Sequence, residues 1–288
     1  MTPTFTIPCP QLVATGLLNP EGVAADGINV YWSEPGLGTV SMRSLGGGSN
    51  TVLASGLVAP RPIATDGSYV YFGENVGGGM VGRVPVGGGS VQPLATGLNG
   101  PWDVATDGIA LYWSEQNGGT VSAVPVVGGS VTILAAGIQV ARGIAVQAGV
   151  VYYVDLASGT NGSVYSVPAG GGSSTLLATG FDSPDAIATD GVSVFVAEFR
   201  SGGTISAVPV TGGSSVALVS NVPYPIAIAT DGTSVFWTEG SGNLRKIPVA
   251  GGSPQTLWSS GQPDGVAVDA VAVYWSAYGN GYIGRCGR

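Results

Sequence analysis

The chain of 288 residues contains 50 Gly and 19 Pro, about twice the roughly 12% combined share of these residues in an average protein. Hydrophobic residues make up an ordinary 44%, so the glycines must mark turns in a packed fold rather than belong to a disordered chain. Charged residues reach only 9%, against roughly 25% in typical domains, which argues against long amphipathic helices. With a net charge of −8 and no long apolar run, we expect neither nucleic-acid binding nor membrane insertion.

Histidine is absent from the sequence, and this excludes several kinds of catalytic site. Ser-His-Asp and Cys-His catalysis need an imidazole, as do His-ligated metals. The many GGGS segments are not followed by the Lys of a phosphate-binding loop, so a P-loop is excluded as well. An enzyme with this composition would have to use carboxylates, Tyr, Arg or a hard cation.

One sequence unit occurs seven times, at intervals of 38 to 43 residues. The unit reads P-x-x-V/I-A-x-D-G-x-x-V-Y-W-x-E, a Gly-rich turn, G-T-V-S-x-V-P-V, GGGS and x-x-L-A-x-G-L. Its Asp-Gly position is occupied by Asp26, Asp66, Asp107, Gln147, Asp190, Asp231 and Asp269. Four short strand-like runs per unit predict an all-β, seven-bladed β-propeller of four-stranded antiparallel blades. Because long runs of helix formers are absent, a parallel α/β fold is the weaker alternative.

The repeats predict a single propeller domain over residues 1–288. The predicted blades are residues 20–56, 60–97, 101–137, 141–180, 184–220, 225–258 and 263–288, the last completed by residues 11–17. The last copy stops after its third strand, whereas the segment from Leu12 to Leu17 matches the outer strand of the other copies. We therefore expect the N-terminal strand to complete the last blade, which closes the ring and removes an exposed sheet edge.

The two cysteines fall on the two sides of this predicted seam. Cys9 precedes the N-terminal strand, and Cys286 lies in the third strand of the last copy. Their placement predicts a disulfide, and two unpaired buried thiols are the alternative. A bridge that spans nearly the whole chain would stabilise it by on the order of 5 kcal/mol. Because disulfides persist in oxidising compartments, we expect an extracellular, cell-surface or periplasmic protein.

The segments VATDGIALYWSE at 104–115 and GVAVDAVAVYWSA at 265–277 resemble the YWTD repeats of the low-density-lipoprotein-receptor class B propellers. They are also similar to bacterial NHL-like and virginiamycin-B-lyase-like propellers. The YWTD resemblance implies that the acid ending the motif bonds within and between blades. The matching positions are Glu34, Glu74, Glu115, Asp155, Glu198 and Glu239, with Ala277 departing from the pattern. The lyase-like family implies a histidine and a divalent metal, so that activity is not expected in a chain without histidine.

Comparison of the copies with one another separates repeated residues from variable ones. Twelve of the 17 acids occupy repeated positions, and the other five lie in loops that lead from an outer strand to the next inner strand: Glu21, Asp103, Asp182, Asp185 and Asp264. The position after the loop proline, which Ala141 replaces in the fourth copy, holds Glu21, Arg61, Trp102, Arg142, Asp185, Ile226 and Asp264. Such loops meet at one end of a propeller's central channel, where a rigid scaffold presents variable residues to a ligand.

Aromatic residues outside the repeat pattern, together with Arg200, are expected on the same face. The predicted ligand-binding residues are Glu21, Arg61, Trp102, Asp103, Arg142, Phe181, Asp185, Phe199, Tyr224, Asp264 and Tyr278. Alternatively, these loops simply hold charges in solvent. No cofactor is predicted, although Glu21, Asp103, Asp185 and Asp264 could together hold Ca²⁺.

These features favour a secreted or cell-surface protein that binds a glycan, peptide or protein at the channel mouth without transforming it. One alternative is a glycoside hydrolase or lyase in which two mouth acids serve as general acid and base, so whether the chain is an enzyme stays open. Another is a structural unit that assembles with copies of itself. The expected partners are therefore a protein or carbohydrate ligand, with self-assembly as a further hypothesis.

Overall fold

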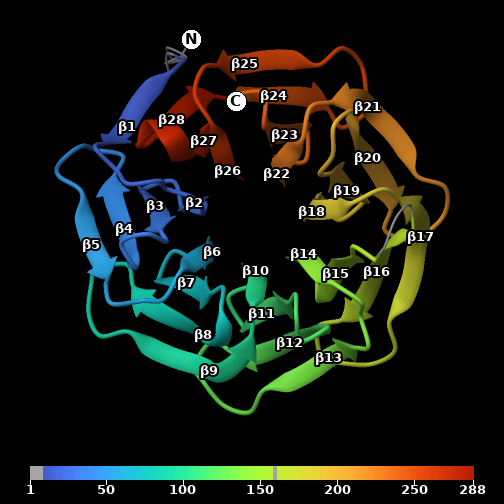
Figure 1. Cartoon of the computed structure of the whole chain (residues 1–288), viewed down its shortest axis with the longest axis horizontal. Helices are drawn as coiled ribbons and strands as arrows, with labels where there is room; N and C mark the ends of the chain where they lie inside the picture. Colours follow the sequence, from blue (N-terminus) through green and yellow to red (C-terminus); the bar gives the residue numbers. More distant parts are fainter. Residues whose placement is uncertain (1–8, 158–160) are drawn as a thin grey trace, which may run out of the picture.

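The computed structural model describes residues 9–157 and 161–288, so residues 1–8 of the predicted domain and 158–160 of its fourth blade lie outside the described residues. Seven four-stranded antiparallel sheets surround a central axis (Figure 1). This arrangement confirms the predicted all-β, seven-bladed propeller. In the described part of the chain, no helix has the length and apolar character needed to cross a membrane.

Each blade runs from an inner strand at the axis to an outer strand at the rim. The inner strands of blades 1 to 7 are β2 (Val23–Ala25), β6 (Pro60–Thr65), β10 (Pro101–Thr106), β14 (Ala141–Gln147), β18 (Pro184–Thr189), β22 (Pro225–Thr230) and β26 (Pro263–Val268). The second strands are β3 (Asn29–Glu34), β7 (Tyr69–Glu74), β11 (Ala110–Glu115), β15 (Val150–Asp155), β19 (Ser193–Glu198), β23 (Ser234–Glu239) and β27 (Ala272–Ala277). The third strands are β4 (Thr39–Ser44), β8 (Gly77–Pro85), β12 (Thr120–Pro125), β16 (Gly162–Pro168), β20 (Gly203–Pro209), β24 (Asn243–Pro248) and β28 (Tyr282–Gly287). The outer strands are β5 (Thr51–Ala54), β9 (Gln92–Asn99), β13 (Thr132–Ala136), β17 (Thr175–Phe181), β21 (Val216–Val222), β25 (Gln255–Ser259) and β1 (Gln11–Thr15), and a short 3-10 turn, η1 (Tyr278–Asn280), precedes β28.

The second strands form the core because neighbouring blades cover both of their faces. Their β-branched and aromatic residues suit a pleated strand, and Trp32, Trp113, Trp237 and Trp275 are fully buried. One apolar cluster fills each of the seven interfaces between blades; Trp32 of blade 1, for example, packs with Tyr274 of blade 7. Burial of a large apolar side chain contributes about 1.5–3 kcal/mol, so the Tyr-Trp positions hold the ring together.

The Asp-Gly turns between the inner and second strands are held by their own carboxylates. Asp66 Oδ1 accepts the N–H groups of Ser68 and Tyr69 at 2.8 Å, and Oδ2 accepts the Tyr71 hydroxyl at 2.7 Å. Burial opposes ionisation of Asp66, but these hydrogen bonds outweigh it and hold the pKa of the carboxyl below its usual value. The repeated aspartate is therefore a turn residue that also fixes the tyrosine of its own blade.

The acid at the end of the YWxE motif holds the loop that enters its own blade. Glu34 Oε1 accepts the Leu18 N–H at 2.7 Å, while Oε2 accepts Trp32 Nε1–H at 3.1 Å. Glu74, Glu115 and Glu198 accept the corresponding loop N–H groups. These acids are therefore occupied by the scaffold, and the loops they hold carry the variable residues of the propeller face.

The N-terminal strand completes the last blade, as predicted. β1 pairs antiparallel with β28, and Figure 1 shows these two strands side by side although they come from opposite ends of the chain. Cys9 and Cys286 form the predicted disulfide across this seam, with Cα atoms 4.6 Å apart. The N-terminal segment that leads into blade 1 is thus held in blade 7 both by sheet hydrogen bonds and by a covalent bridge.

Loss of the disulfide is expected to lower stability, because the bridge restricts the unfolded chain over a separation of 277 residues. Chain entropy gives a loss of about 5 kcal/mol for the Cys9→Ala, Cys286→Ala double variant, or a decrease in Tm on the order of 10 °C. Differential scanning calorimetry of the oxidised protein and the variant measures the change. Wild-type protein reduced with a phosphine separates loss of the bridge from loss of the buried Cys286 side chain, and equal Tm values for oxidised and reduced wild type would contradict the expectation.

Candidate functional site

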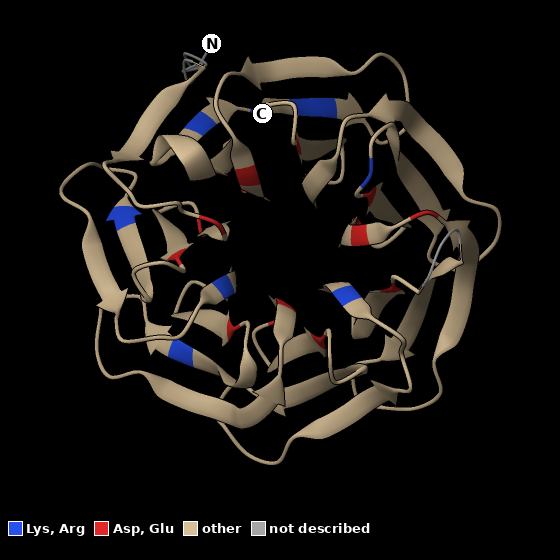
Figure 2. Ribbon diagram, in the orientation of Figure 1, with Lys and Arg blue, Asp and Glu red and all other residues tan. Residues whose placement is uncertain are grey.

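One end of the propeller axis is hollowed into a cavity of about 600 Å³. Its wall contains the residue that follows the loop proline, or its Ala141 equivalent, in every blade. These seven residues are called the mouth ring: Glu21, Arg61, Trp102, Arg142, Asp185, Ile226 and Asp264. Figure 2 shows charged residues on the strands next to the axis, whereas the outer strands carry none. The position after the loop proline thus supplies one side chain from each blade to a single cavity.

A local irregularity of the inner strands places the mouth-ring side chains. In six blades the register between the inner and second strands shifts directly after the first residue of the inner strand, as between Pro60 and Ile63. The mouth-ring residue therefore has no partner in the ladder. Such bulges bend a strand and redirect a side chain, which explains how this position faces the channel while the following residues stay in the sheet.

Hydroxyl groups in the second strands fix the backbone of the mouth ring and link one blade to the next. The Ser33 hydroxyl accepts the Gly22 N–H at 3.0 Å and donates to the Arg61 carbonyl of blade 2 at 2.9 Å. Ser276 makes the same pair of bonds to Gly265 and to the Glu21 carbonyl, and Thr238 bonds in this way to the Asp264 carbonyl. These three bridges run continuously from blade 6 through the seam to blade 2.

The backbones of neighbouring blades also approach each other so closely that glycine is required directly after Glu21 and directly after Asp264. A Cβ atom on Gly22 would lie 2.3 Å from the Arg61 carbonyl oxygen, and one on Gly265 would lie 2.5 Å from the Glu21 carbonyl oxygen. Any side chain there would force the neighbouring blade away. The mouth ring is consequently a close-packed part of the scaffold, although its side chains face a cavity.

Each of the two arginines of the cavity forms an ion pair with an acid of the mouth ring. Arg61 binds Glu21 through two contacts, Nε to Oε2 at 3.0 Å and Nη2 to Oε1 at 3.2 Å. Arg142 Nη1 lies 3.2 Å from Asp185 Oδ1, and the Arg142 guanidinium stacks 3.6 Å from the centre of the Trp102 ring. Fork-like pairing and stacking both restrict the guanidinium plane, so these four charges are preorganised.

Asp264 differs from the other cavity acids because its carboxylate has no hydrogen-bond or ion-pair partner among the described residues. Burial raises its pKa, and the charge of Arg61 opposes this shift. Asp264 in turn repels its neighbours: the pKa of Glu21 rises to about 7, mainly by burial, with Arg61 lowering it and Asp264 raising it further. Burial also raises the pKa of Asp185, against the effect of Arg142 and with that of Asp264. The carboxyl groups of Glu21, Asp185 and Asp264 are thus electrostatically coupled across the cavity.

Asp103, which lies beside the mouth ring, is a link between blades. Its Oδ1 accepts the Val104 N–H at 2.9 Å, and Oδ2 accepts the Ile144 N–H of blade 4 at 3.0 Å. Burial nevertheless raises the pKa of Asp103 to about 6, against these hydrogen bonds and with a contribution from Asp185. Asp103 fixes blade 4 to blade 3 where the Ser114 hydroxyl, at the position of the bridging hydroxyls, makes no hydrogen bond with any described residue.

The four predicted aromatic residues outside the mouth ring lie in different places in the structure. Phe199 lines the cavity, is 45% exposed and packs against Tyr224 with ring centres 5.7 Å apart. Tyr224 and Tyr278 lie exposed in loops of the same face, outside the cavity wall. The placement of Phe181 at the mouth is wrong, because β17 extends to this residue and turns its side chain into the core between blades 4 and 5.

Sequence comparison missed an apolar part of the wall. Ile226 belongs to the mouth ring itself, and Ile63, Ile187, Ile228 and Val266 of the inner strands also face the cavity. Comparison of the copies named Ile226 at the variable position, but the predicted ligand-binding residues did not include it, because an isoleucine carries neither a charge nor an aromatic ring. The other four belong to a repeated apolar position, which sequence variation does not distinguish from the core.

The four acids proposed for Ca²⁺ do not form a metal site. Among the residues that the structure describes, no three Asp, Glu or Cys side chains are arranged to hold a metal ion. Glu21 and Asp185 are paired with arginines, and Asp103 is bonded to backbone N–H groups. Three of the four candidate carboxylates are thus engaged elsewhere, and Asp264 alone cannot supply the roughly six to eight oxygen ligands that Ca²⁺ takes.

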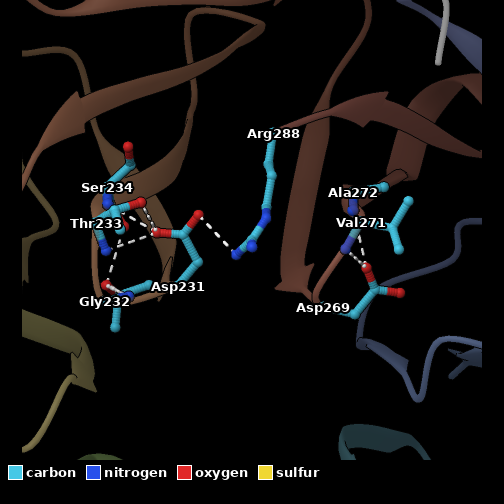
Figure 3. Close-up of polar contacts among 9 residues, drawn as sticks. Asp231, Gly232, Thr233, Ser234, Asp269, Val271, Ala272 and Arg288 are labelled. Carbon is cyan, nitrogen blue, oxygen red and sulfur yellow. Dashed lines mark hydrogen bonds and ion pairs between the residues drawn. The ribbon is translucent and has the colours of Figure 1, made fainter. Parts of the chain in front are cut away.

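The opposite end of the axis contains a second hollow of about 420 Å³, lined by Asp-Gly turn residues. Figure 3 shows Arg288 of blade 7 reaching the turn of blade 6, where Nη1 lies 3.0 Å from Asp231 Oδ2. Asp269 Oδ1 meanwhile accepts the Val271 and Ala272 N–H groups of its own turn. These polar groups serve turns and the contact between blades.

No family model and no curated protein matches this sequence. Solved structures do match: virginiamycin B lyase from Staphylococcus aureus has a TM-score of 0.77 at 16% identity, over 97% of this chain and 98% of that chain. Kuenenia stuttgartiensis hydrazine synthase has a TM-score of 0.78 at 14% identity, over 96% and 97%. A chain of the nidogen–laminin complex has a TM-score of 0.61 at 17% identity, over 74% and 87%. At these identities the likeness shows the propeller fold alone, and the fold is shared by enzymes and binding proteins.

The raised carboxyl pKa values predict that acidification stabilises the protein over part of the pH range. A carboxyl with a raised pKa in the folded state contributes stability that is fully present below its unfolded pKa, roughly 4, and lost as pH rises through the folded value. These folded values are about 7 for Glu21 and about 6 for Asp103. The turn acids Asp66 and Asp107 have lowered pKa values, so their contribution is lost at low pH instead. We expect Tm, followed by calorimetry, to be highest near about pH 5 and to fall by several degrees towards pH 8.

The Glu21→Gln variant tests the assignment of this slope. It removes one titrating group, so its Tm should change less between pH 5 and pH 8 than that of the wild type. Asp182→Asn is the matched control, because it removes one negative charge from the same face outside the cavity wall. A wild-type Tm that is constant between pH 5 and pH 8 would contradict the coupling of burial and charge described above.

Proposed function

We propose that the protein is a secreted or cell-surface binding protein that holds a peptide or protein segment, or a glycan, in the mouth-ring cavity. The observation that carries this proposal is the mouth ring itself. Seven blades share one template, yet the position after the loop proline holds five different residue types across the blades, Glu, Arg, Trp, Asp and Ile, and all seven side chains line the same cavity. Variation on a rigid scaffold is the usual design of a binding surface.

The cavity has the size and lining of a ligand site. Its volume of about 600 Å³ falls within the range of roughly 300–1,000 Å³ for ligand pockets, and its wall combines aliphatic side chains with a few fixed charges. The Phe199–Tyr224 pair extends an exposed aromatic surface beyond the cavity. Aromatic residues are enriched at the centres of protein interfaces, which favours a peptide or protein segment as the ligand.

Two further observations support the location and the partner class. The Cys9–Cys286 disulfide fits an oxidising compartment, such as the cell exterior or the periplasm. One propeller of similar fold was solved in the nidogen–laminin complex, so this architecture is compatible with recognition of another protein. Both observations agree with the proposed location and partner class.

Peptide and glycan arrays test this function directly. Ligands found for the wild type should bind the Phe199→Ala variant at least tenfold more weakly, because the ring is an exposed wall of the cavity. Ile109→Ala is the matched control, since Ile109 is an exposed apolar residue at the opposite end of the propeller. Ligands that bind Phe199→Ala as tightly as wild type would place the binding surface elsewhere.

A carboxylate-based hydrolase or lyase is the second candidate, favoured by one observation. Burial and Asp264 raise the pKa of Glu21 to about 7, where a carboxylic acid can donate a proton at neutral pH. Under this hypothesis Asp264 serves as the second carboxyl group. Product analysis after incubation with a panel of polysaccharides should show turnover that Glu21→Gln reduces by at least about 100-fold. No product with any substrate would exclude this candidate and leave the binding function.

A further inference from the structure

We propose that the cavity recognises a basic peptide side chain, with the lysine ammonium or arginine guanidinium held against the Asp264 carboxylate. This inference rests on the proposed binding function and specifies the ligand of the same cavity. It depends on the charges of the wall, on the positions of its ion pairs and on its apolar surface.

The wall carries an excess of negative charge that the protein itself does not neutralise. Four acids and two arginines line the cavity, which gives a formal charge of −2 when all are ionised. Glu21 and Asp185 are each paired with one of the arginines. No described cation is left for Asp264, whose carboxylate makes no hydrogen bond or ion pair within residues 9–157 and 161–288. A ligand cation would supply the missing partner and form a charge-assisted hydrogen bond in a partly desolvated site.

The groups around Asp264 favour a cation over an anion. Glu21 of the adjacent blade and Asp185 are both close enough for Asp264 to raise the pKa of their carboxyl groups. Arg61 lowers the pKa of the Asp264 carboxyl, but its guanidinium makes its direct contacts with Glu21. An acidic ligand would have to displace a bidentate pair or a stacked arginine, whereas a basic ligand meets a carboxylate that is already free.

The wall also suits the hydrocarbon part of a basic side chain. Ile63, Ile228 and Val266 provide an aliphatic surface for the methylene stem of lysine or arginine. Phe199 adds an aromatic face that is still exposed and can attract a cation. Arg142 already lies over Trp102 in this way, at 3.6 Å, so the cavity demonstrably accommodates a guanidinium on a ring.

Protonation of the wall should weaken such binding. The ionisable groups that face Asp264 in the cavity are Glu21, Arg61 and Asp185, with Asp103 and Arg142 farther along the wall. Burial raises the pKa values of all four acids, and that of Glu21 reaches about 7. As pH falls from 8 to 5 the wall therefore loses negative charge, and a basic ligand loses affinity. The acidic chain as a whole, with a net charge of −8, also favours approach of a basic ligand.

Calorimetric titration with three blocked tripeptides tests the inference. The probes are acetyl-Gly-Lys-Gly-amide, its arginine analogue and its norleucine analogue, which keeps the stem and removes the charge. At pH 8 we expect the lysine and arginine peptides to bind at least tenfold more tightly than the norleucine peptide. Asp264→Asn should weaken the basic peptides at least tenfold, whereas Asp182→Asn, the same charge change outside the cavity wall, should change their affinity less than twofold. Wild-type affinity for the basic peptides should fall at least tenfold at pH 5.

Equal binding of the lysine and norleucine peptides would overturn the inference, as would unchanged affinity for the basic peptides in Asp264→Asn protein that calorimetry shows to be folded. Failure of this inference is distinguishable from failure of the proposed function. A neutral or acidic array ligand that is lost in Phe199→Ala but retained in Asp264→Asn would leave the binding function and remove the cation specificity. If no array ligand depends on the cavity and none of the tripeptides binds, both are wrong.

Discussion

The antiparallel pairing of β1 with β28 brings the first blade against the last, and the cavity depends on that contact. Glu21 lies at the start of blade 1 and Asp264 at the start of blade 7, so these two acids come close together only when the ring is closed. Ser276 then fixes their spacing, because its hydroxyl binds the Gly265 N–H on one side and the Glu21 carbonyl on the other. The seam, which sheet pairing and a disulfide both reinforce, therefore holds two mutually repelling carboxyl groups in place.

In an inner strand, the residue that belongs to the sheet and the residue that faces the cavity are direct neighbours in the sequence. Pro263 begins its strand and pairs with Ala277, whereas Asp264 directly after it has no partner in the ladder and faces the cavity. The backbone of Asp264 is nevertheless fixed, since its carbonyl accepts the Thr238 hydroxyl. A side chain at this position can thus change without disturbing the ladder. This is the physical reason that one position of the repeat varies from acid to arginine, tryptophan and isoleucine.

The repeat pattern predicted the ring, the closing strand and the disulfide because these features depend on local turn chemistry and on counting strands. It also located the mouth ring, since a position that varies among similar blades stands out from the template. It misplaced Phe181, because the length of β17 is decided by pairing with Gly162 and not by the local sequence. It could not pair Arg61 with Glu21 or Arg142 with Asp185, because those contacts depend on how far each bulge turns a side chain towards the next blade.

The electrostatic balance at Glu21 is a physical reason for proposing binding ahead of catalysis at the cavity. Burial and the charge of Asp264 favour the protonated form of Glu21. Arg61 contacts both carboxylate oxygens of Glu21 and favours the ionised form. A general acid would have to leave this bidentate contact to donate its proton. A cation bound at Asp264 instead adds a second positive charge, which lowers the pKa of Glu21 and strengthens the existing pair. Ligand binding and ionisation of the wall then reinforce one another, and a cavity with one free carboxylate between two occupied ion pairs is suited to that coupling.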